Sequence, residues 1–337
     1  MPAGVAAPGR RAAAGRAGRR SCAIGDWVAH VVGIALALVS SLFWGAADFL
    51  AGLANRRAPL ATVLLGTQLA GLALVGLVLL VRGDGLPRDA RLGYAALGAA
   101  GAVVGLGALY RGLALGPMGV VAPISALSGA VPVLAGLALG ERPSWLQLVG
   151  MALSLLGVAA AAAAPSMPAG GQPGWVAAGL GLLAAAGIGS ALVGLNAAST
   201  VHPGWAVLVL RLTVVTALVG GLALRQVLGR AFGAVRPLER PAAAGVDPGA
   251  GDSGLQADAR RVPAVQIVTA GTLDAGANLL FGVASNFGAL SVVGLLGSLY
   301  PVSTVLLARF VLGERLRPVQ LAGVGAVLAG VSAISLG

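Results

Sequence analysis

The chain has 337 residues, of which 58% are hydrophobic and only 10% are charged, with a net charge of +11. Soluble domains carry about 25% charged residues, so this composition excludes a soluble globular fold. Every basic residue is an arginine, and most lie in the N-terminal tail or in loops. The positive charge therefore indicates membrane topology and not nucleic-acid binding. The single cysteine, Cys22, can form no internal disulfide and suggests no metal site.

Residues 1–30 form a tail rich in Arg, Ala and Gly, which predicts a disordered cytoplasmic extension. Its pairs Arg10–Arg11 and Arg19–Arg20 are compatible with a twin-arginine export signal. The apolar segment that follows is long enough to span a membrane, and many more such segments come after it. Retention of this segment as the first membrane helix is therefore favoured over cleavage.

Apolar segments of spanning length recur along the whole chain, because a membrane helix needs about 20 such residues. The expected helices are 31–53, 59–81, 92–114, 117–139, 145–164, 174–196, 204–224, 264–286, 289–312 and 318–336. Trp145, Trp175 and Trp205 each stand at the start of a segment, where the indole ring favours the headgroup region. The sequence therefore predicts an all-α integral membrane protein with ten transmembrane helices.

The chain repeats itself. The run Gly140-Glu141-Arg142 and the residues after it recur 173 positions later, beginning at Gly313, whereas the earlier part of each half aligns at an offset of 144. The offsets differ by 29, which equals the excess length of the link 225–263 over the link 82–91. One insertion in the second half therefore explains both offsets.

Two repeats follow from this alignment, at residues 31–164 and 174–337, with 225–263 as an inserted loop that we expect to be disordered. Each repeat holds five spans. Because five is odd, the second copy must enter the membrane in the opposite orientation. Inverted repeats of this kind are common in transporters, which bind their substrate between the halves near the midplane.

Four sequence passages carry a family resemblance. Ser41-Leu42-Phe43-Trp44-Gly45, Val121-Ala122-Pro123-Ile124-Ser125 and the two Gly-Glu-Arg runs make the chain similar to the EamA-type branch of the drug/metabolite transporter superfamily. The resemblance extends over about residues 31–337. It implies ten helices, two cytoplasmic termini and the transport of small solutes such as amino acids, nucleotide metabolites or drugs.

Two features depart from that pattern. The insertion 225–263 is long and charged, and the ten-helix topology places its arginines outside, against the positive-inside rule, which the tail and the 82–91 loop obey. Pro132 has no proline counterpart, since Pro301 aligns with Ser128. The kink of the ninth segment is therefore expected about one turn away from that of the fourth.

Charged residues inside spans are the candidate functional residues, because a charge at the bilayer centre costs about 2.5–3.5 kcal/mol. Asp274 lies about 15 Å inside the eighth segment. It shares a face with Asn278 and Ser285, and the counterpart face of the third segment is mostly glycine. We expect both faces to point inward, with Asp274 as the coupling or binding residue. A structural Asp bonded to nearby hydroxyls is the alternative.

Four further charged residues each have more than one possible role. Asp48 lies one helical turn from Trp44, and the two could engage a cationic or aromatic solute, or Asp48 could be merely hydrated near an interface. Arg211 could pair with Asp274, bind an anion, or extend toward the interface. Glu141 and Glu314 each follow a glycine at a helix end and are expected to cap a helix or form an ion pair.

No enzymatic or ATP-binding motif is found, and His30 and His202 have no partners at metal-ligand spacing, so no cofactor or metal is expected. The sequence favours a secondary transporter, an exporter or exchanger of a small metabolite or drug-like solute, in the inner (plasma) membrane. Its expected partners are the bilayer, the solute and protons, with a homodimer as an open possibility. A channel, a non-transporting membrane subunit and a membrane enzyme without a known motif are the alternatives.

Overall fold

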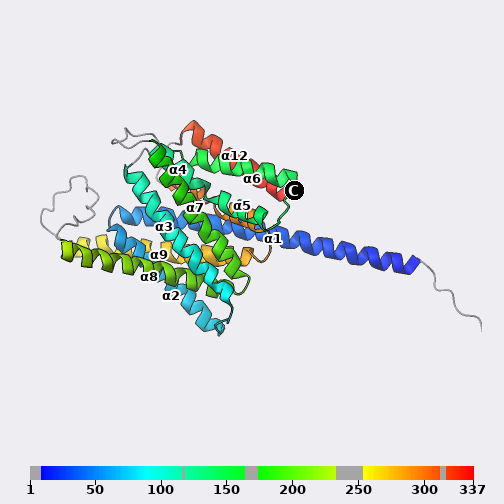
Figure 1. The fold of residues 1–337 in the computed structure, drawn as a ribbon, viewed down its shortest axis with the longest axis horizontal. Coiled ribbons are helices and arrows are strands. Elements are labelled where there is room, and N and C mark those ends of the chain that lie inside the picture. The colour runs from blue at the N-terminus through cyan, green and yellow to red at the C-terminus, as the bar shows by residue number, and fades with distance from the viewer. Residues whose placement is uncertain (1–8, 116–117, 164–173, 233–252, 312–315) are drawn as a thin grey trace, which may run out of the picture.

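The computed structural model describes residues 9–115, 118–163, 174–232, 253–311 and 316–337 (Figure 1). Within these ranges the chain is helical and contains no β-strand. The helices are α1 (Gly9–Asn55), α2 (Leu60–Arg82), α3 (Gly93–Leu115), α4 (Met118–Ser125), α5 (Ala130–Ala138), α6 (Trp145–Ala161), α7 (Gly174–Ser199), α8 (Pro203–Phe232), α9 (Ser253–Ala284), α10 (Leu290–Gly297), α11 (Tyr300–Val311) and α12 (Pro318–Leu336). Two 3-10 turns, η1 (Ala90–Leu92) and η2 (Ala126–Gly129), precede α3 and α5.

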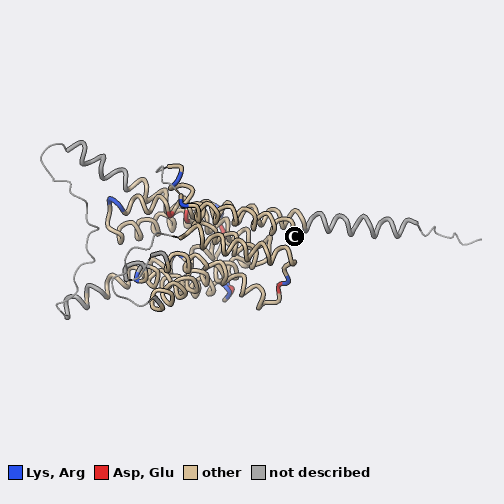
Figure 2. Tube along the Cα trace, turned by 90° about the horizontal axis from the view of Figure 1, so that it is seen from above, with Lys and Arg blue, Asp and Glu red and all other residues tan. Residues whose placement is uncertain are grey.

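The described residues contain nine helical segments that are long and apolar enough to cross a membrane. Two of these segments are interrupted helices, Val120–Ala138 and Leu290–Val311. A tenth apolar helix, α6, has 17 residues, which is about 25 Å of helix. Figure 2, which colours the chain trace by residue type, shows few charged residues along the described part of the bundle. The predicted all-α membrane fold with ten spans is confirmed.

The sequence repeat has a structural counterpart at the start of α6 and α12. The Gln147 side-chain oxygen accepts a hydrogen bond from the backbone N–H of Ser144, and Gln320 accepts one from Arg317, each at 3.0 Å. Each glutamine satisfies a backbone donor that the first helical turn leaves without a partner. The repeated motif therefore begins the last helix of each half in the same way.

The fourth and ninth segments are broken at equivalent positions. α4 ends at Ser125 and α10 ends just before Ser298, 173 residues later. Each hydroxyl donates to the carbonyl three residues earlier, at 2.9 Å for Ser125 and 2.6 Å for Ser298. The sequence predicted that the ninth segment bends about one turn away from the equivalent position in the fourth, because Pro301 does not align with Pro132. This prediction is wrong. The serines that compete for helical carbonyls mark the break in both halves, whatever the position of the proline.

Two segments predicted to be disordered are partly helical. α1 begins at Gly9, so the tail between Gly9 and residue 30 continues the first span, and Figure 1 shows it projecting past the bundle. α8 continues to Phe232, and α9 begins at Ser253, so both ends of the predicted loop 225–263 are helical too. Ala, Arg and Leu favour helix, which lets a span continue beyond its apolar part. Residues 233–252 lie outside the described ranges.

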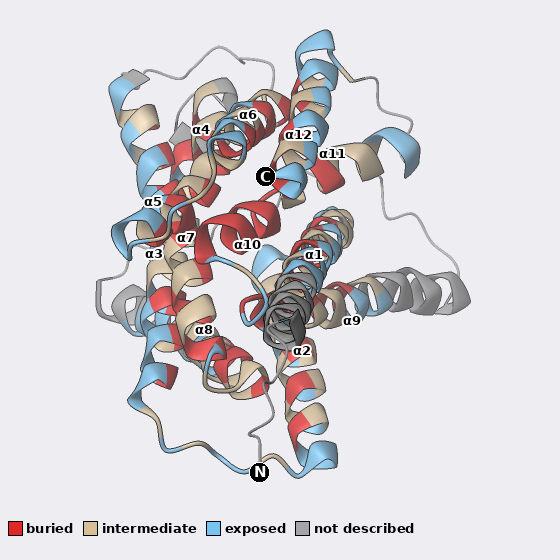
Figure 3. Cartoon of the chain, turned by 90° about the vertical axis from the view of Figure 1, so that its right-hand side faces the viewer, coloured by how far each residue is buried: buried red, intermediate tan, exposed pale blue. Residues whose placement is uncertain are grey.

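Helices of one half pack on helices of the other. α1 packs along α9, α3 along α7, and α6 along α12. The α3–α7 contact runs along the predicted glycine face, where a Cβ at Gly105 would lie 2.9 Å from the Cα of Gly187. The expected close approach is therefore present. Figure 3 shows α10 at the centre, and all eight of its residues are buried. The inverted orientation of the two halves stays a prediction.

One end of the bundle brings both terminal helices together. Gly337 lies beside Ser144 at the start of α6, and His30 of α1 borders a pocket with Gln147 of the same helix. We call this the proximal end, and the opposite end, where α1 ends at Asn55, the distal end. Because successive spans alternate in direction, α8 and α10 start at the proximal end, and α2, α5, α7 and α9 finish there.

Candidate functional site

An ion pair occupies the middle of the bundle. Arg211 of α8 donates from Nη2 to Oδ2 of Asp274 of α9, at 2.7 Å. The Arg211 side chain is completely buried, whereas that of Asp274 is 28% exposed. Arg211 lies eight residues from the start of α8 and Asp274 ten from the end of α9, which is about 12–15 Å from the proximal end. The sequence suggested several roles for Arg211. The structure shows it paired with Asp274, and its side chain does not extend toward the membrane interface.

The buried guanidinium is enclosed by α2. Its Nη1 donates to Oε1 of Gln68 at 3.0 Å. A Cβ at Gly71, one turn further along α2, would lie 2.5 Å from the same Nη1, and Gly271 of α9 contacts the backbone at Thr67. Two glycines therefore let α2, α8 and α9 close around one charged group. Nε of Arg211 has no hydrogen-bond partner among the described residues.

Asn278 lies one turn from Asp274 on the same face of α9. Its amide donates to the Asp274 carbonyl oxygen at 2.6 Å and lies 3.5 Å from the carboxylate Oδ1. Asn278 is buried. The predicted inward face of α9 is found, and the amide supports the turn of helix that carries the carboxylate.

Asp48 of α1 is the second carboxylate near the pair. It interacts electrostatically with Asp274, and its side chain is exposed on the protein. No hydrogen bond or ion pair joins it to another residue in the described ranges. Asp48 lies seven residues before the end of α1, about 10 Å from the distal end. The site therefore holds two carboxylates and one guanidinium, of which only Asp48 has no opposite charge.

Trp44 belongs to an aromatic cluster beside this site. Its ring centroid lies 5.6 Å from that of Phe281 of α9 and 6.5 Å from that of Tyr300 of α11. Gly297, at the end of α10, makes room for the cluster, since a Cβ there would lie within 3.3 Å of both Trp44 and Phe281. The cluster joins α1, α9, α10 and α11 and places Trp44 one turn from Asp48.

Ser285, the last predicted site residue, lies apart from the others. It follows the end of α9 and donates to the carbonyl of Phe281 at 2.9 Å. Eleven residues separate it from Asp274, which is about 16 Å of helix. The structure therefore brings five of the six predicted residues together and leaves Ser285 near the proximal end. Gln68 was missed, although an amide inside the apolar run of α2 is a detectable signal.

The related positions of the other half hold no charge. The repeat aligns Arg211 with Thr67 and Asp274 with Gly101. Thr67 donates to the carbonyl of Leu64 on its own helix, and Gly101 packs against Ser190. The Arg211–Asp274 ion pair is therefore a property of the second half alone and not a requirement of the packing of the repeat.

The proximal end carries two further polar contacts between the halves. Asp84 Oδ2, in the link after α2, lies 3.3 Å from Nε2 of His202, and the Asp84 carbonyl accepts from the Trp205 indole at 3.3 Å. The carboxylate of Glu141, after α5, accepts from the backbone N–H of Leu290 at 2.7 Å and of Ser291 at 2.9 Å. The expectation that Glu141 caps a helix is met, with the difference that the helix, α10, belongs to the other half.

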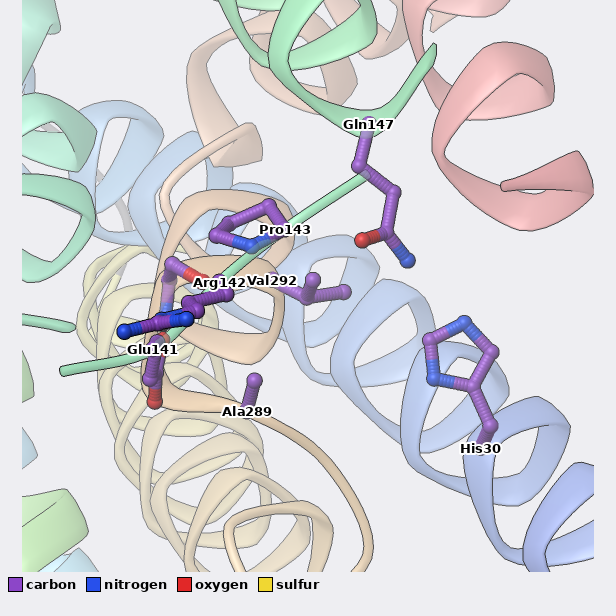
Figure 4. Close-up of a pocket in the computed structure, with 8 residues that line it drawn as sticks. His30, Glu141, Arg142, Pro143, Gln147, Ala289 and Val292 are labelled. Atoms are coloured by element: carbon purple, nitrogen blue, oxygen red, sulfur yellow. Dashed lines mark hydrogen bonds between the residues drawn. The ribbon is translucent and has the colours of Figure 1, made fainter. Parts of the chain in front are cut away.

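A pocket of about 260 Å³ adjoins the Glu141 contact. Figure 4 shows His30 of α1 on one side of it and Glu141 and Pro143 on the other. The His30 Nε2 atom is buried and makes no hydrogen bond among the described residues. Glu314, the counterpart of Glu141, lies outside the described ranges. No group of three His, Cys, Asp or Glu side chains that could hold a metal occurs in the described parts of the chain.

Comparison with known proteins gives one match to a solved structure and one to a family model, the latter over part of the chain. A solved structure whose title reads only "Crystal structure of protein" shares the fold, with a TM-score of 0.64 and 18% identity over 91% of this chain and 97% of the other. No curated protein gives a match. Residues 31–162, almost the whole first repeat, match the EamA-like transporter family. The resemblance to the EamA-type branch of the drug/metabolite transporters, predicted from the sequence, is therefore confirmed, and residues 31–162 carry an EamA-like transporter unit.

Proposed function

We propose that the protein is a secondary transporter that moves a small metabolite or drug-like solute across the cytoplasmic membrane, as an exporter or exchanger, by alternating access. The EamA-like match supports the class of protein. The single observation that carries the proposal is the group of three charged side chains, Asp48, Arg211 and Asp274, in the middle of an otherwise apolar bundle.

The energetic cost of this group supports a working role. A single charge at the centre of a bilayer helix costs about 2.5–3.5 kcal/mol. Pairing offsets part of that cost for Arg211 and Asp274, which lie 2.7 Å apart. Asp48 has no such partner among the described residues. A proton or a cationic group bound at Asp48 would offset its charge.

The roles of the two carboxylates follow from their partners. Asp274 was the stronger candidate in the sequence, as a lone deep carboxylate, but it is held by Arg211 at 2.7 Å. We assign the binding of a proton or cationic group to Asp48, and a positioning role to the Arg211–Asp274 pair and Asn278. Trp44, one turn from Asp48, offers an aromatic face to the apolar part of a solute.

Flux measurements in proteoliposomes test this proposal. Vesicles containing the purified protein are loaded with an isotopically labelled metabolite extract, a pH gradient is imposed, and the solutes that move are identified by mass spectrometry. We expect saturable flux and counterflow for one class of solute. Flux that rises linearly with gradient would instead indicate a channel, and chemical conversion of the solute an enzyme.

Asp48→Asn is the informative variant, because it keeps the shape of the side chain and removes its charge. We expect gradient-driven flux to fall at least about tenfold, the effect of losing roughly 1.4 kcal/mol of interaction. Asp89→Asn is the matched control, because Asp89 pairs with Arg91 in the exposed link before α3. Equal flux and equal pH dependence in wild type and Asp48→Asn would contradict the assignment.

A further inference from the structure

We propose that the Asp84–His202 and Glu141–α10 contacts form a two-part gate that closes the proximal end of the transport path. This inference rests on the proposed transport function. Each contact joins the two halves of the repeat, and each lies at the proximal end of the bundle. Transport by alternating access requires both to break when the path opens at that end.

The first part of the gate holds the start of α8. His202 precedes Pro203, the first residue of α8, and its Nδ1 accepts the backbone N–H of Trp205 at 3.3 Å. Because Nδ1 is an acceptor, the ring proton lies on Nε2 and points to the Asp84 carboxylate, 3.3 Å away. Asp84 also accepts from Nε of Arg82 at 2.9 Å. The link after α2 is thereby fastened to α8 of the other half.

The second part holds the start of α10. The first turn of a helix leaves backbone N–H groups without partners, and Ala289, the N-cap residue of α10, supplies no side-chain hydrogen bond. Glu141 supplies two from the first half, at 2.7 and 2.9 Å. Its negative charge also favours the positive end of the helix dipole. A Cβ at Gly136 would overlap the Glu141 carboxylate, so a glycine is needed there.

Both helices connect the gate to the candidate site. Arg211 lies about two turns along α8 from His202, and Gly297, at the far end of α10, supports the rings of Trp44 and Phe281. Movement of either helix start must therefore shift the ion pair or the aromatic cluster, because a helix moves as a rigid element. Asp48, the exposed carboxylate, lies on the distal side of the pair. Both contacts at the proximal end are formed in the structure.

Cysteine accessibility tests the gate without a known solute. Cys22, the only cysteine of the chain, is first replaced by serine. Ser199→Cys then serves as the probe, because Ser199 is 1% exposed at the end of α7, beside the gate. The double variant Asp84→Asn/Glu141→Gln should raise the rate of labelling by a water-soluble maleimide roughly tenfold, the effect of losing one charge-assisted hydrogen bond on an opening equilibrium.

Asp89→Asn is the matched control, since Asp89 pairs with Arg91 within the link that also contains Asp84 and makes no bridge between halves. It should label at the wild-type rate. If the variant with Glu141→Gln fails to elute as a folded protein, Asp84→Asn alone, in a link outside the spans, provides the test. Labelling of the gate variants at the wild-type rate would overturn the proposal.

Crosslinking tests the second requirement, that the gate opens during transport. Cysteines at 84 and 202, joined by a short cleavable thiol reagent, should stop solute flux, and cleavage should restore it. Cysteines at 147 and 337 are the control pair, at the same end but between α6 and α12; their crosslink should leave flux unchanged. Full flux through the 84–202 crosslink overturns the gate. Absence of flux in the uncrosslinked protein refutes the transport function instead, and the labelling result then decides the gate by itself.

Discussion

Arg211 and Asp274 form a 2.7 Å ion pair at positions whose counterparts in the other half are Thr67 and Gly101. At these two positions, therefore, only the second half of the repeat carries charge. The uncharged side shows that helices can pack at this depth with a threonine and a glycine. The pair is therefore not needed to build the bundle, which makes a functional reason for it more persuasive.

Removing one member of the pair should destabilise the protein. Asp274→Asn leaves the buried Arg211 without an opposite charge, and breaking a buried pair in this way costs about 3–5 kcal/mol. Arg211→Met/Asp274→Asn removes the unpaired charge and should recover much of that loss. Thermal unfolding of the purified variants in detergent measures both. Losses that simply add would mean that the two residues are not coupled.

Close packing around the guanidinium predicts a sharp difference between two glycines of α2. Gly71→Ala places a Cβ 2.5 Å from Nη1 of Arg211, and overpacking of this kind costs about 1–3 kcal/mol. Gly76→Ala meets no atom within 4 Å and should be neutral or slightly stabilising, because Ala favours helix over Gly by about 1 kcal/mol. The melting temperatures of the two variants decide the question. Equal melting temperatures would contradict the close contact between Gly71 and the Arg211 guanidinium.

The ten spans and the inward face of α9 could be predicted because both depend on local patterns. Hydropathy over about 20 residues identifies a span, and three-and-four spacing places Asp274 and Asn278 on one face. The residue that this face of α9 contacts could not be predicted. Arg211 is 63 residues away, and periodicity shows only which residues share a face, not which faces meet. Pairing therefore remained one of three readings of Arg211.

The errors of prediction have physical causes of their own. Composition predicted disorder in residues 9–30, at 225–232 and at 253–263, where helices extend from the neighbouring spans. Alanine and arginine are at once common in disordered tails and good helix formers. The helix breaks were attributed to proline, whereas Ser125 and Ser298 mark them. A serine that bonds to its own helix is common in sequence and gives no distinct signal.

Topology is tested in a variant in which Cys22 is replaced by serine and one new cysteine at a time is introduced and labelled. The contact between Asp84 and His202 puts these two residues on the same side of the membrane, and Arg57, in the link after α1, lies at the distal end. We expect an impermeant thiol reagent to reach positions 84 and 202 from one side and position 57 from the other. Because 57 and 202 follow the first helix of their respective halves, opposite labelling also supports the inverted repeat. Labelling of 57 and 202 from one side would contradict it.

Shortening the link between α8 and α9 should leave the fold intact, provided that the helices are spared. The first half joins its equivalent helices with only ten residues, 82–91, and loop closure changes by only about 0.6 kcal/mol for each doubling of length. Because α8 continues to Phe232 and α9 begins at Ser253, the deletion should remove 236–250 and stop there. We expect this variant to elute and melt like the wild type.

A deletion of 235–260 also removes the first turns of α9, and a larger loss of stability is expected for it. If both deletions are equally harmless, the helical start of α9 contributes nothing to stability; if 236–250 alone prevents folding, the link has a structural role that its absence from the first half does not predict.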